Sequence, residues 1–308
     1  MTLAELNESI ETGDVSEIIR VAEARQVKAI SRLADEICAQ PGVRLVPLAG
    51  ASSAGKTTTA KRLATQLRVN DRVALHLSTD DYFVDNLAYP RDENGELDYE
   101  HVACVDAERL VADLSALMAS RPVHLRRFDF VTHRGTDAEQ AVTLPPDAVI
   151  VLEGIHALNP QLTPGISEEA KFGVFVAPQP SIELLPGLRP TAADARLLRR
   201  LVRDNRFRKV APDETFGLWP KVLAGEKRWI EPFRAQARGM FDSYLVYELA
   251  ALRPYVGGLL VRAHERIGDN PTLVRLVHIL EHALPLAGDK IPGDSIIRET
   301  IGGSQLDY

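Results

Sequence analysis

The chain has 308 residues and 45% of them are hydrophobic, which is enough to bury the core of one large α/β domain or of two smaller ones. With 36 Lys+Arg and 43 Asp+Glu, the net charge of −7 argues against a protein that coats nucleic acid or an anionic membrane. Cys38 and Cys104 form no CxxC motif, the acidic N-terminus has no apolar signal core, and no apolar run approaches the roughly 20 residues of a membrane span. We therefore expect a cytoplasmic protein with neither membrane nor nucleic acid as a partner.

The first predicted element is a helix over residues 15–40, where apolar side chains recur every three or four positions. Asp14 and Glu17 have the spacing of a capping box at its start, and Pro41-Gly42 ends it. A helix of this kind more often packs beside a core than binds a partner protein. We expect residues 1–42 to form a helical segment packed on the main domain.

The next stretch predicts a phosphate-binding loop between a buried strand over residues 43–49 and a helix. Residues 50–57 match G-x-x-x-x-G-K-[ST] at every fixed position, whereas an ordinary glycine-rich turn would not explain the Lys-Thr pair. Gly50 and Gly55 let successive backbone N–H groups face phosphate oxygens, Lys56 reaches the β- and γ-phosphates, and the Thr57 hydroxyl can ligate Mg²⁺. The residues expected to bind the nucleotide are Gly50, Ala51, Ser52, Ser53, Ala54, Gly55, Lys56, Thr57 and Thr58.

Two consecutive acids follow the second predicted strand. A helix over 56–70 and a strand over 73–79 begin a βαβ rhythm, and Asp80 and Asp81 come directly at the carboxyl end of that strand, where open α/β sheets bind ligands. On an extended backbone their side chains point to opposite sides, so only one can face the phosphates. We choose Asp80 as the base that accepts the proton of the acceptor hydroxyl, with a helix-capping role for the pair as the structural alternative.

A hairpin is predicted after a helix over residues 106–120. Residues 123–130 alternate as a strand, His133-Arg134-Gly135 look like a turn, and residues 140–144 return as the second arm. We assign this hairpin, residues 123–145, to the acceptor site.

The apolar run 148–152 predicts an interior strand with a carboxylate, Glu153, at its tip. This is the position of a Walker-B acid, which ligates Mg²⁺ directly or through water; a surface acid at a strand end is the alternative. Another short strand is predicted over 171–176.

From residue 193 the pattern is helical almost to the end, with breaks predicted near Pro212, Pro232, Pro254 and Asn270-Pro271. His278 and His282 share one predicted helical face, but no third metal ligand is evident, so surface or core histidines are the more common explanation.

Four arginines at spacings of three and four give the first of these helices a basic face that can close over phosphates as a lid. A solvated basic face or a nucleic-acid contact is the alternative, which the phosphate loop makes less attractive. The arginines are Arg196, Arg199, Arg200 and Arg203.

These motifs, in this order, resemble those of uridine kinases, within the uridine kinase and phosphoribulokinase group of P-loop kinases. The matching segments lie between about residues 43 and 204 and read GASSAGKTTTAKRL, STDDYF, LDYEHVACVD, RFDFVTHR, VLEGIH and DARLLRRLVRD. The later stretch, from WPKVLAGEKRWIEPF to DSIIRETIGGS, is similar to a bacterial branch of uridine kinase-like nucleoside kinases. Members of that branch often carry an N-terminal TGS domain, which we expect this chain to lack.

The resemblance implies roles for individual residues. It places Asp80 as the base, Asp98 on the ribose hydroxyls and His133 on the pyrimidine. It also places Arg196 and Arg199 on the phosphate side, as catalytic residues together with Lys56. Arg203 would lie beside the nucleotide. The residues beside the acceptor would be Phe128, Phe130 and Arg134. Two departures concern the acceptor: Phe128 stands where uridine kinases commonly have Tyr, and the family's DHP segment is rewritten as DYEHVACVD.

The prediction is thus a doubly wound, mostly parallel α/β P-loop fold over residues 43–308, with a lid region at 191–235 and a helical C-terminal part at 236–308. With ATP and Mg²⁺ it would phosphorylate the 5′-hydroxyl of uridine or cytidine to give UMP or CMP. A different sugar or a polyol as the acceptor remains an alternative. Outside enzymes, a nucleotide-dependent switch would need a guanine-reading [NT]-K-x-D motif and an RNA-binding module an aromatic-basic platform, and neither is found. The expected partner is a small-molecule acceptor, and homo-oligomerisation is left open.

Overall fold

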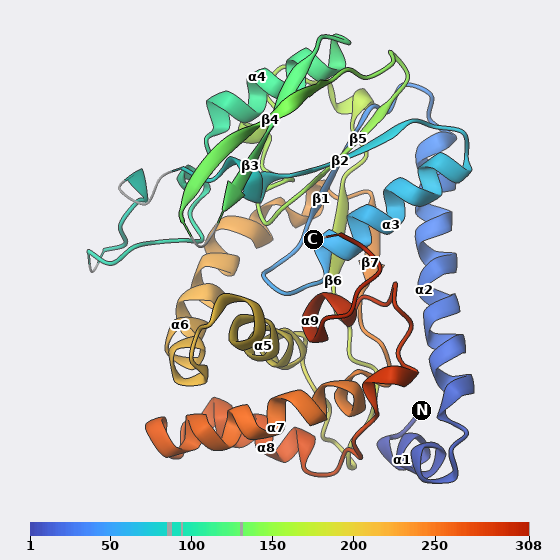
Figure 1. Cartoon of the computed structure of the whole chain (residues 1–308), viewed down its shortest axis with the longest axis vertical. Helices are drawn as coiled ribbons and strands as arrows, with labels where there is room; N and C mark the ends of the chain where they lie inside the picture. Colours follow the sequence, from blue (N-terminus) through green and yellow to red (C-terminus); the bar gives the residue numbers. More distant parts are fainter. Residues whose placement is uncertain (85–87, 94, 130–131, 308) are drawn as a thin grey trace.

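The computed structural model describes residues 1–84, 88–93, 95–129 and 132–307. Its centre is a five-stranded parallel sheet with the strand order β2-β5-β1-β6-β7 (Figure 1). The strands are β1 (Leu45–Ala49), β2 (Ala74–Ser78), β5 (Val149–Glu153), β6 (Val174–Ala177) and β7 (Gly239–Asp242). Because β1 is central and pairs with β5 and β6, the loop after it opens in the middle of the carboxyl edge of the sheet.

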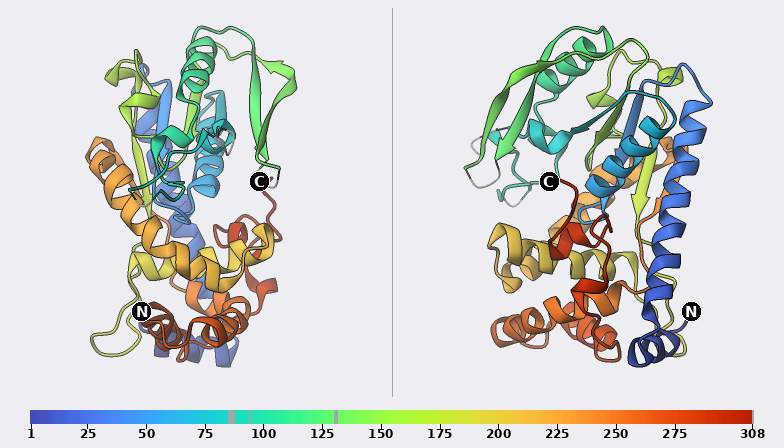
Figure 2. Two further views of the ribbon diagram at one scale, coloured as in Figure 1. Left: turned by 90° about the vertical axis from the view of Figure 1, so that its left-hand side faces the viewer. Right: turned by 45° about the vertical axis from the view of Figure 1, so that its right-hand side comes forward.

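Alternate strand side chains pack into two apolar clusters, one on each face of the sheet, as the period of two requires. One cluster joins α2 (Val15–Cys38) and α3 (Lys56–Val69) to Val46, Leu48, Val149, Val151, Val174 and Val176. The other joins α4 (Ala107–Met118) to Leu45, Ala49, Ile150, Leu152 and Phe175. Helices therefore cover both faces (Figure 2), which confirms the prediction of a doubly wound α/β fold.

The predicted hairpin forms a separate antiparallel pair, β3 (Val123–Asp129) and β4 (Arg134–Val142). The second arm starts earlier than expected, because Arg134 and Gly135 already pair with Asp129 and Phe128. The prediction that these two residues lie in the turn is therefore wrong.

The C-terminal half is mostly helical, and its α-helices lie in the lower half of Figure 1. The prediction of helix from residue 193 almost to the end misses β7, which pairs in parallel with β6 at the sheet edge. The predicted break at Pro254 is also wrong, since this residue lies inside α7. The helices are α5 (Ala192–Arg203), α6 (Pro212–Gly225), α7 (Glu248–Ile267), α8 (Pro271–Leu280) and α9 (Arg298–Ile301).

The N-terminal segment contains two helices, α1 (Leu3–Thr12) and α2, and their buried apolar side chains belong to the main apolar cluster. The expected capping box at Asp14 is absent, because its side chain makes no cap hydrogen bond; Thr2 and Glu5 form a capping box on α1 instead. Among the helices of the described residues, none is both long and apolar enough to cross a lipid bilayer. Cys38 and Cys104 are both free thiols.

Candidate active site

A cavity of about 550 Å³ lies at the carboxyl edge of the sheet, next to the ends of β1, β2 and β5. It brings together most of the residues that the sequence predicted for phosphate, metal and acceptor binding. The predicted site residues among its walls are Ser52, Ser53, Gly55, Lys56, Thr57, Asp80, Phe128, His133, Glu153 and Arg203. Gly50, Ala51 and Ala54 of the same loop, and Thr58 in the first turn of α3, are not among the lining residues of this cavity.

The phosphate loop takes the curled form that its glycines allow. A Cβ on Gly50 would lie 2.2 Å from the carbonyl oxygen of Val176, and Gly55 has a φ of 86°, so neither position accommodates a side chain without strain. The Nζ of Lys56 donates to the carbonyl oxygen of Ala51 at 3.2 Å. The loop leads directly into α3, whose N-terminus favours bound anions.

Glu153 forms a cluster of oxygen ligands with two hydroxyls. Its Oε1 accepts hydrogen bonds from Thr57 Oγ1 at 3.0 Å and from Ser78 Oγ at 2.9 Å. Burial alone would raise the pKa of Glu153, but His76 and Lys56 outweigh that effect, and the pKa lies below its ordinary value. An ionised carboxylate beside hydroxyls suits a hard divalent cation, so Thr57 and Glu153 fit the expected Mg²⁺.

Asp80 and Asp81 lie in a short 3₁₀ helix, Thr79–Tyr82, and not on an extended backbone. The assumption that their side chains point to opposite sides is therefore wrong, and both line the cavity. Asp81 is engaged by the hairpin: its Oδ1 accepts from Phe128 N at 3.3 Å and its Oδ2 lies 3.7 Å from Arg127. Burial, followed by the charge of Glu153, raises the pKa of Asp80 to about 6.

The resemblance implies phosphate-side roles for Arg196 and Arg199, but neither is among the lining residues of this cavity. Arg199 Nη1 does reach the phosphate loop, where it donates to the carbonyl oxygen of Ser53 at 3.4 Å. Arg196 is buried and its Nη2 lies 2.6 Å from Glu226. Arg199 is buried and donates two hydrogen bonds of 2.6 Å to Glu248. Their carboxylate partners come from segments that follow α5, so the basic face of this helix is divided between the protein interior and the cavity.

Three arginines from α5 and the turn after it line the cavity, Arg200, Arg203 and Arg208, and Arg127 of the hairpin lines it as well. Arg200 donates to Ser52 Oγ at 2.9 Å, which ties α5 to the phosphate loop. The charge of Arg203, followed by burial, lowers the pKa of Arg208 to about 10. Repulsion between neighbouring guanidinium groups of this kind is relieved by an anion, so the cluster suits phosphate.

Aromatic side chains form the end of the cavity beside the hairpin. The ring of Phe83 lies 5.9 Å from that of Phe128 and 6.1 Å from that of Tyr89. His133 also lines this end, and its Nδ1 is buried without a hydrogen-bond partner among the described residues. Arg134 is exposed and does not line the cavity, and Phe130 lies outside the described residues.

Asp98 lines a second, adjacent cavity of about 350 Å³. Its carboxylate accepts hydrogen bonds from Glu100 N at 3.2 Å and from Trp229 Nε1 at 3.3 Å. Glu100 lines both cavities, burial raises its pKa, and its Oε2 is buried without a hydrogen-bond partner in the described part of the chain. Sequence reasoning missed Glu100, although it lies inside the segment LDYEHVACVD.

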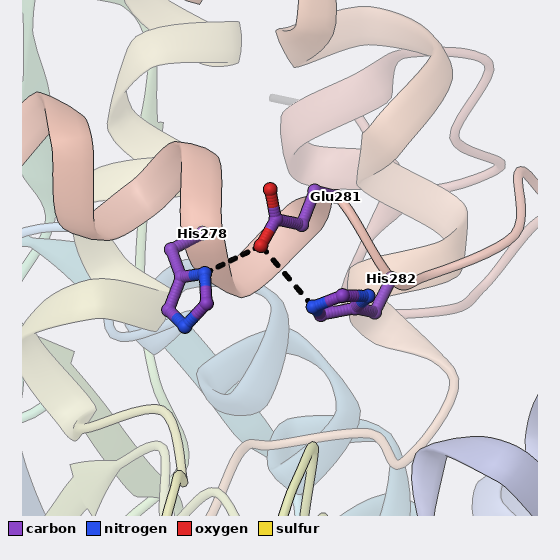
Figure 3. A group of neighbouring side chains, drawn as sticks. All are labelled: His278, Glu281 and His282. Carbon is purple, nitrogen blue, oxygen red and sulfur yellow. Dashed lines mark hydrogen bonds and ion pairs between the residues drawn. The ribbon is translucent and has the colours of Figure 1, made fainter.

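A separate cluster stands at the end of α8, where His278 and His282 flank Glu281 (Figure 3). Sequence reasoning missed Glu281 as a candidate third ligand, although the order H-x-x-E-H could have revealed it. His282 Nε2 lies 3.1 Å from Glu281 Oε1, and His278 hydrogen-bonds the same oxygen. All three side chains are exposed and none lines the phosphate cavity, so we interpret the cluster as a surface ion-pair group.

Comparison with known proteins gives matches over the part of the chain that contains the phosphate loop and most of the cavity. Residues 45–211 match the model of the Phosphoribulokinase / Uridine kinase family. A curated uridine kinase of Lactobacillus helveticus (strain DPC 4571) is 30% identical over 194 residues, covering 63% of this chain and 83% of that protein. One of Deinococcus deserti is 31% identical over 169 residues, covering 55% and 72%. The solved structure of a "Possible Uridine Kinase" from Bacillus stearothermophilus aligns with a TM-score of 0.46 and 21% identity, covering 71% of this chain and 100% of that one.

Proposed function

The chain belongs to the phosphoribulokinase and uridine kinase family, and from that premise we propose that this ATP-dependent kinase phosphorylates the 5′-hydroxyl of uridine or cytidine. The observation that supports the proposal most directly is the cavity of about 550 Å³, which is lined by the phosphate loop and, at one end, by aromatic side chains. A ring could pack against that end while its attached sugar reaches toward the phosphates.

Each step of phosphoryl transfer has a residue of this chain to serve it. The loop amides and Lys56 hold the donor phosphates, and Thr57 and Glu153 would hold Mg²⁺. The cation, when bound, neutralises charge on the phosphates. Asp80 accepts the proton that leaves the acceptor hydroxyl, and Arg203 with its neighbouring arginines stabilises the charge of the migrating phosphoryl group.

The ribose is expected to be held by carboxylates. The resemblance assigns this role to Asp98, but a ribose in the main cavity would meet Glu100 first, because Asp98 lines only the adjacent cavity. We therefore propose Glu100 as a further ribose ligand. Glu100→Gln should raise the KM for the nucleoside more than Asp98→Asn does; the opposite ranking would return the role to Asp98.

A coupled assay of ADP release over nucleosides, free sugars and polyols tests the acceptor. Uridine and cytidine should be phosphorylated with similar efficiency, and 2′-deoxy analogues should be poor substrates because a buried carboxylate would lose a hydrogen-bond donor. Lys56→Ala, which loses the cation at the β- and γ-phosphates but keeps the core, is the matched control and should lose most of the activity. If a sugar or polyol stimulates ADP release and neither nucleoside does, the nucleoside proposal is wrong.

Base selection is expected to be loose. Phe128 can pack against a ring but cannot donate a hydrogen bond, so discrimination would depend on His133 and on backbone groups. Phe128→Tyr restores a hydroxyl near the base and should change the ratio of uridine to cytidine turnover more than it changes turnover itself. An unchanged ratio would place the base away from Phe128.

A further inference from the structure

The C-terminal segment, residues 291–303, lies against the phosphate loop, although the family match ends at residue 211. In Figure 1 its helix, α9, lies between α5 and the start of α3. Ile296 abuts the loop so closely that a Cβ on Gly55 would lie 2.4 Å from Ile296 Cδ1. The segment also contributes Glu299 to the wall of the phosphate cavity.

The carboxylate of Glu299 is hydrogen-bonded to the first turn of α3. Its Oε2 accepts from Thr58 N at 3.3 Å and from Thr58 Oγ1 at 2.6 Å. Because α3 begins at Lys56, the Thr58 amide is its third, one of the four that have no acceptor inside the helix. Such amides are the donors through which a helix N-terminus binds an anion.

The nucleotide requires donors in the same place. In a G-x-x-x-x-G-K-[ST] loop, the amides that continue from the loop into the first helical turn hold the α- and β-phosphates. Glu299 supplies a negative charge to that turn, as a phosphate would, and two anions that share one donor group repel each other. Lys61, one helical turn further along α3, faces the same cavity and experiences the charge of Glu299.

We propose that Glu299 occupies part of the phosphate subsite in the free enzyme, and that the donor nucleotide binds by displacing this carboxylate from Thr58. Glu299 thereby sets the affinity for the donor, although it lies far outside residues 45–211, which match the family model. This inference depends on ATP-dependent kinase activity and does not depend on which acceptor is used.

The contacts around Glu299 allow its side chain to leave without unfolding the segment. Arg298, the preceding residue, donates to the carbonyl oxygens of Pro292 at 3.2 Å, Gly288 at 2.8 Å and Gly302 at 3.2 Å. Ser295 Oγ lies 3.3 Å from the buried hydroxyl of Tyr247. These bonds hold the backbone on both sides of α9 independently of the Glu299 carboxylate.

The test is the affinity for Mg·ADP, measured by titration calorimetry on the full chain. Glu299→Gln keeps the size of the side chain and removes its charge, so ADP should bind about two- to fivefold more tightly, the range expected for one charge at a helix N-terminus. Asp289→Asn removes the same charge from an exposed position that is not in the cavity, and should leave the affinity unchanged. Unchanged or weaker binding in Glu299→Gln would overturn the proposal.

Thermal unfolding gives a second readout that separates this role from a purely structural one. Glu299→Gln should lower the Tm of the free protein and leave the Tm of the ADP-saturated protein close to that of the wild type, because the carboxylate is displaced in the latter. Equal losses in both forms would show that Glu299 only supports the fold, and would also overturn the proposal. If the wild-type chain itself binds no ADP, the kinase assignment fails.

Discussion

Asp80 and Glu153 are two carboxylates of one cavity whose pKa values move in opposite directions. Burial and the charge of Glu153 raise the pKa of Asp80 to about 6, whereas His76 and Lys56 hold the pKa of Glu153 below its ordinary value. Such a pair divides two roles between similar side chains. Glu153 remains charged and can hold a cation, and Asp80 is suited to take up a proton near neutral pH.

The first prediction separates Asp80 from its neighbour. Asp80→Asn should lower kcat by about 10² or more with little change in nucleotide binding, because a base acts mainly in the transition state. Asp81→Asn should do much less, since the Asp81 carboxylate is already engaged by the backbone N–H of Phe128. Steady-state kinetics with both variants would check this, and the reverse ranking would exchange the two roles.

The second prediction concerns stability and pH at Asp80. Its folded pKa of about 6 lies above the ordinary value of 3.8, so the wild-type protein loses stability as the pH rises from about 4 to about 6. A shift of about two units corresponds to at most about 3 kcal/mol, and water in the cavity reduces it. Asp80→Asn should therefore unfold at higher urea than wild type at pH 8. That difference should disappear near pH 4, and a pH-independent difference would contradict the assignment.

The third prediction concerns Glu153 and the cation. Glu153→Gln keeps hydrogen-bonding atoms near Thr57 and Ser78 but loses the charge that attracts Mg²⁺. Its activity should need a higher Mg²⁺ concentration and should recover in part when Mg²⁺ is raised. A Mg²⁺ titration of the initial rate measures this, and a metal dependence equal to that of wild type would give Glu153 a structural role.

At the scale of elements, α5 shows how one helix can serve both the core and the site. Arg196 is paired with Glu226 in the interior, whereas Arg208, just beyond the helix, lines the cavity and is half exposed. Removing one partner of a buried ion pair leaves an uncompensated charge, which commonly lowers the free energy of unfolding by about 3 kcal/mol or more. Removing Arg208 leaves the core intact.

The fourth prediction follows from this division. Arg196→Ala should lower the free energy of unfolding by about 3 kcal/mol, while Arg208→Ala should change it little and lower kcat at least about tenfold, because it removes charge at the phosphoryl group. Urea denaturation and kinetics on the two variants form the experiment. If Arg196→Ala is stable and inactive, Arg196 has the phosphate-side role that the resemblance implies.

The elements that the sequence predicts well are those whose signals are local. Strands β1, β2 and β5 are apolar runs that end in polar motifs, so their existence and order follow from residues 43–153 alone. Strand β7 was missed because an edge strand of four residues, GMFD, has no periodic pattern and forms by pairing with β6. The orientation of the α5 arginines was missed for a related reason. Their partners Glu226 and Glu248 are distant in sequence, and only the tertiary structure brings them near.

At the scale of the molecule, the N-terminal segment is part of the main core. The α2 side chain Ile37 is fully buried in the same cluster as β1 and α3, whereas Val27 on the same helix is 41% exposed.

The fifth prediction is that Ile37→Ala lowers the free energy of unfolding by about 2–5 kcal/mol, as large-to-small substitutions in protein cores do. Val27→Ala should change the free energy of unfolding by no more than about 0.5 kcal/mol. Urea denaturation of both variants measures this. Equal, small effects would mean that residues 1–42 unfold separately from the rest.

The two buried ion pairs of α5 also cross the limit of the family match at residue 211, since Arg196 and Arg199 lie before it and Glu226 and Glu248 after it. A fragment that ends at residue 211 would therefore lose the carboxylate partners of both guanidinium groups and also α6 and α7, which pack against α5, and the remaining fragment would keep the carboxylates without their arginines. Neither half is expected to fold by itself. When the two fragments are expressed together, the arginines of one can pair with the glutamates of the other, and β6 can pair with β7. The loop at residues 209–211 is therefore a suitable place to divide the enzyme for fragment complementation.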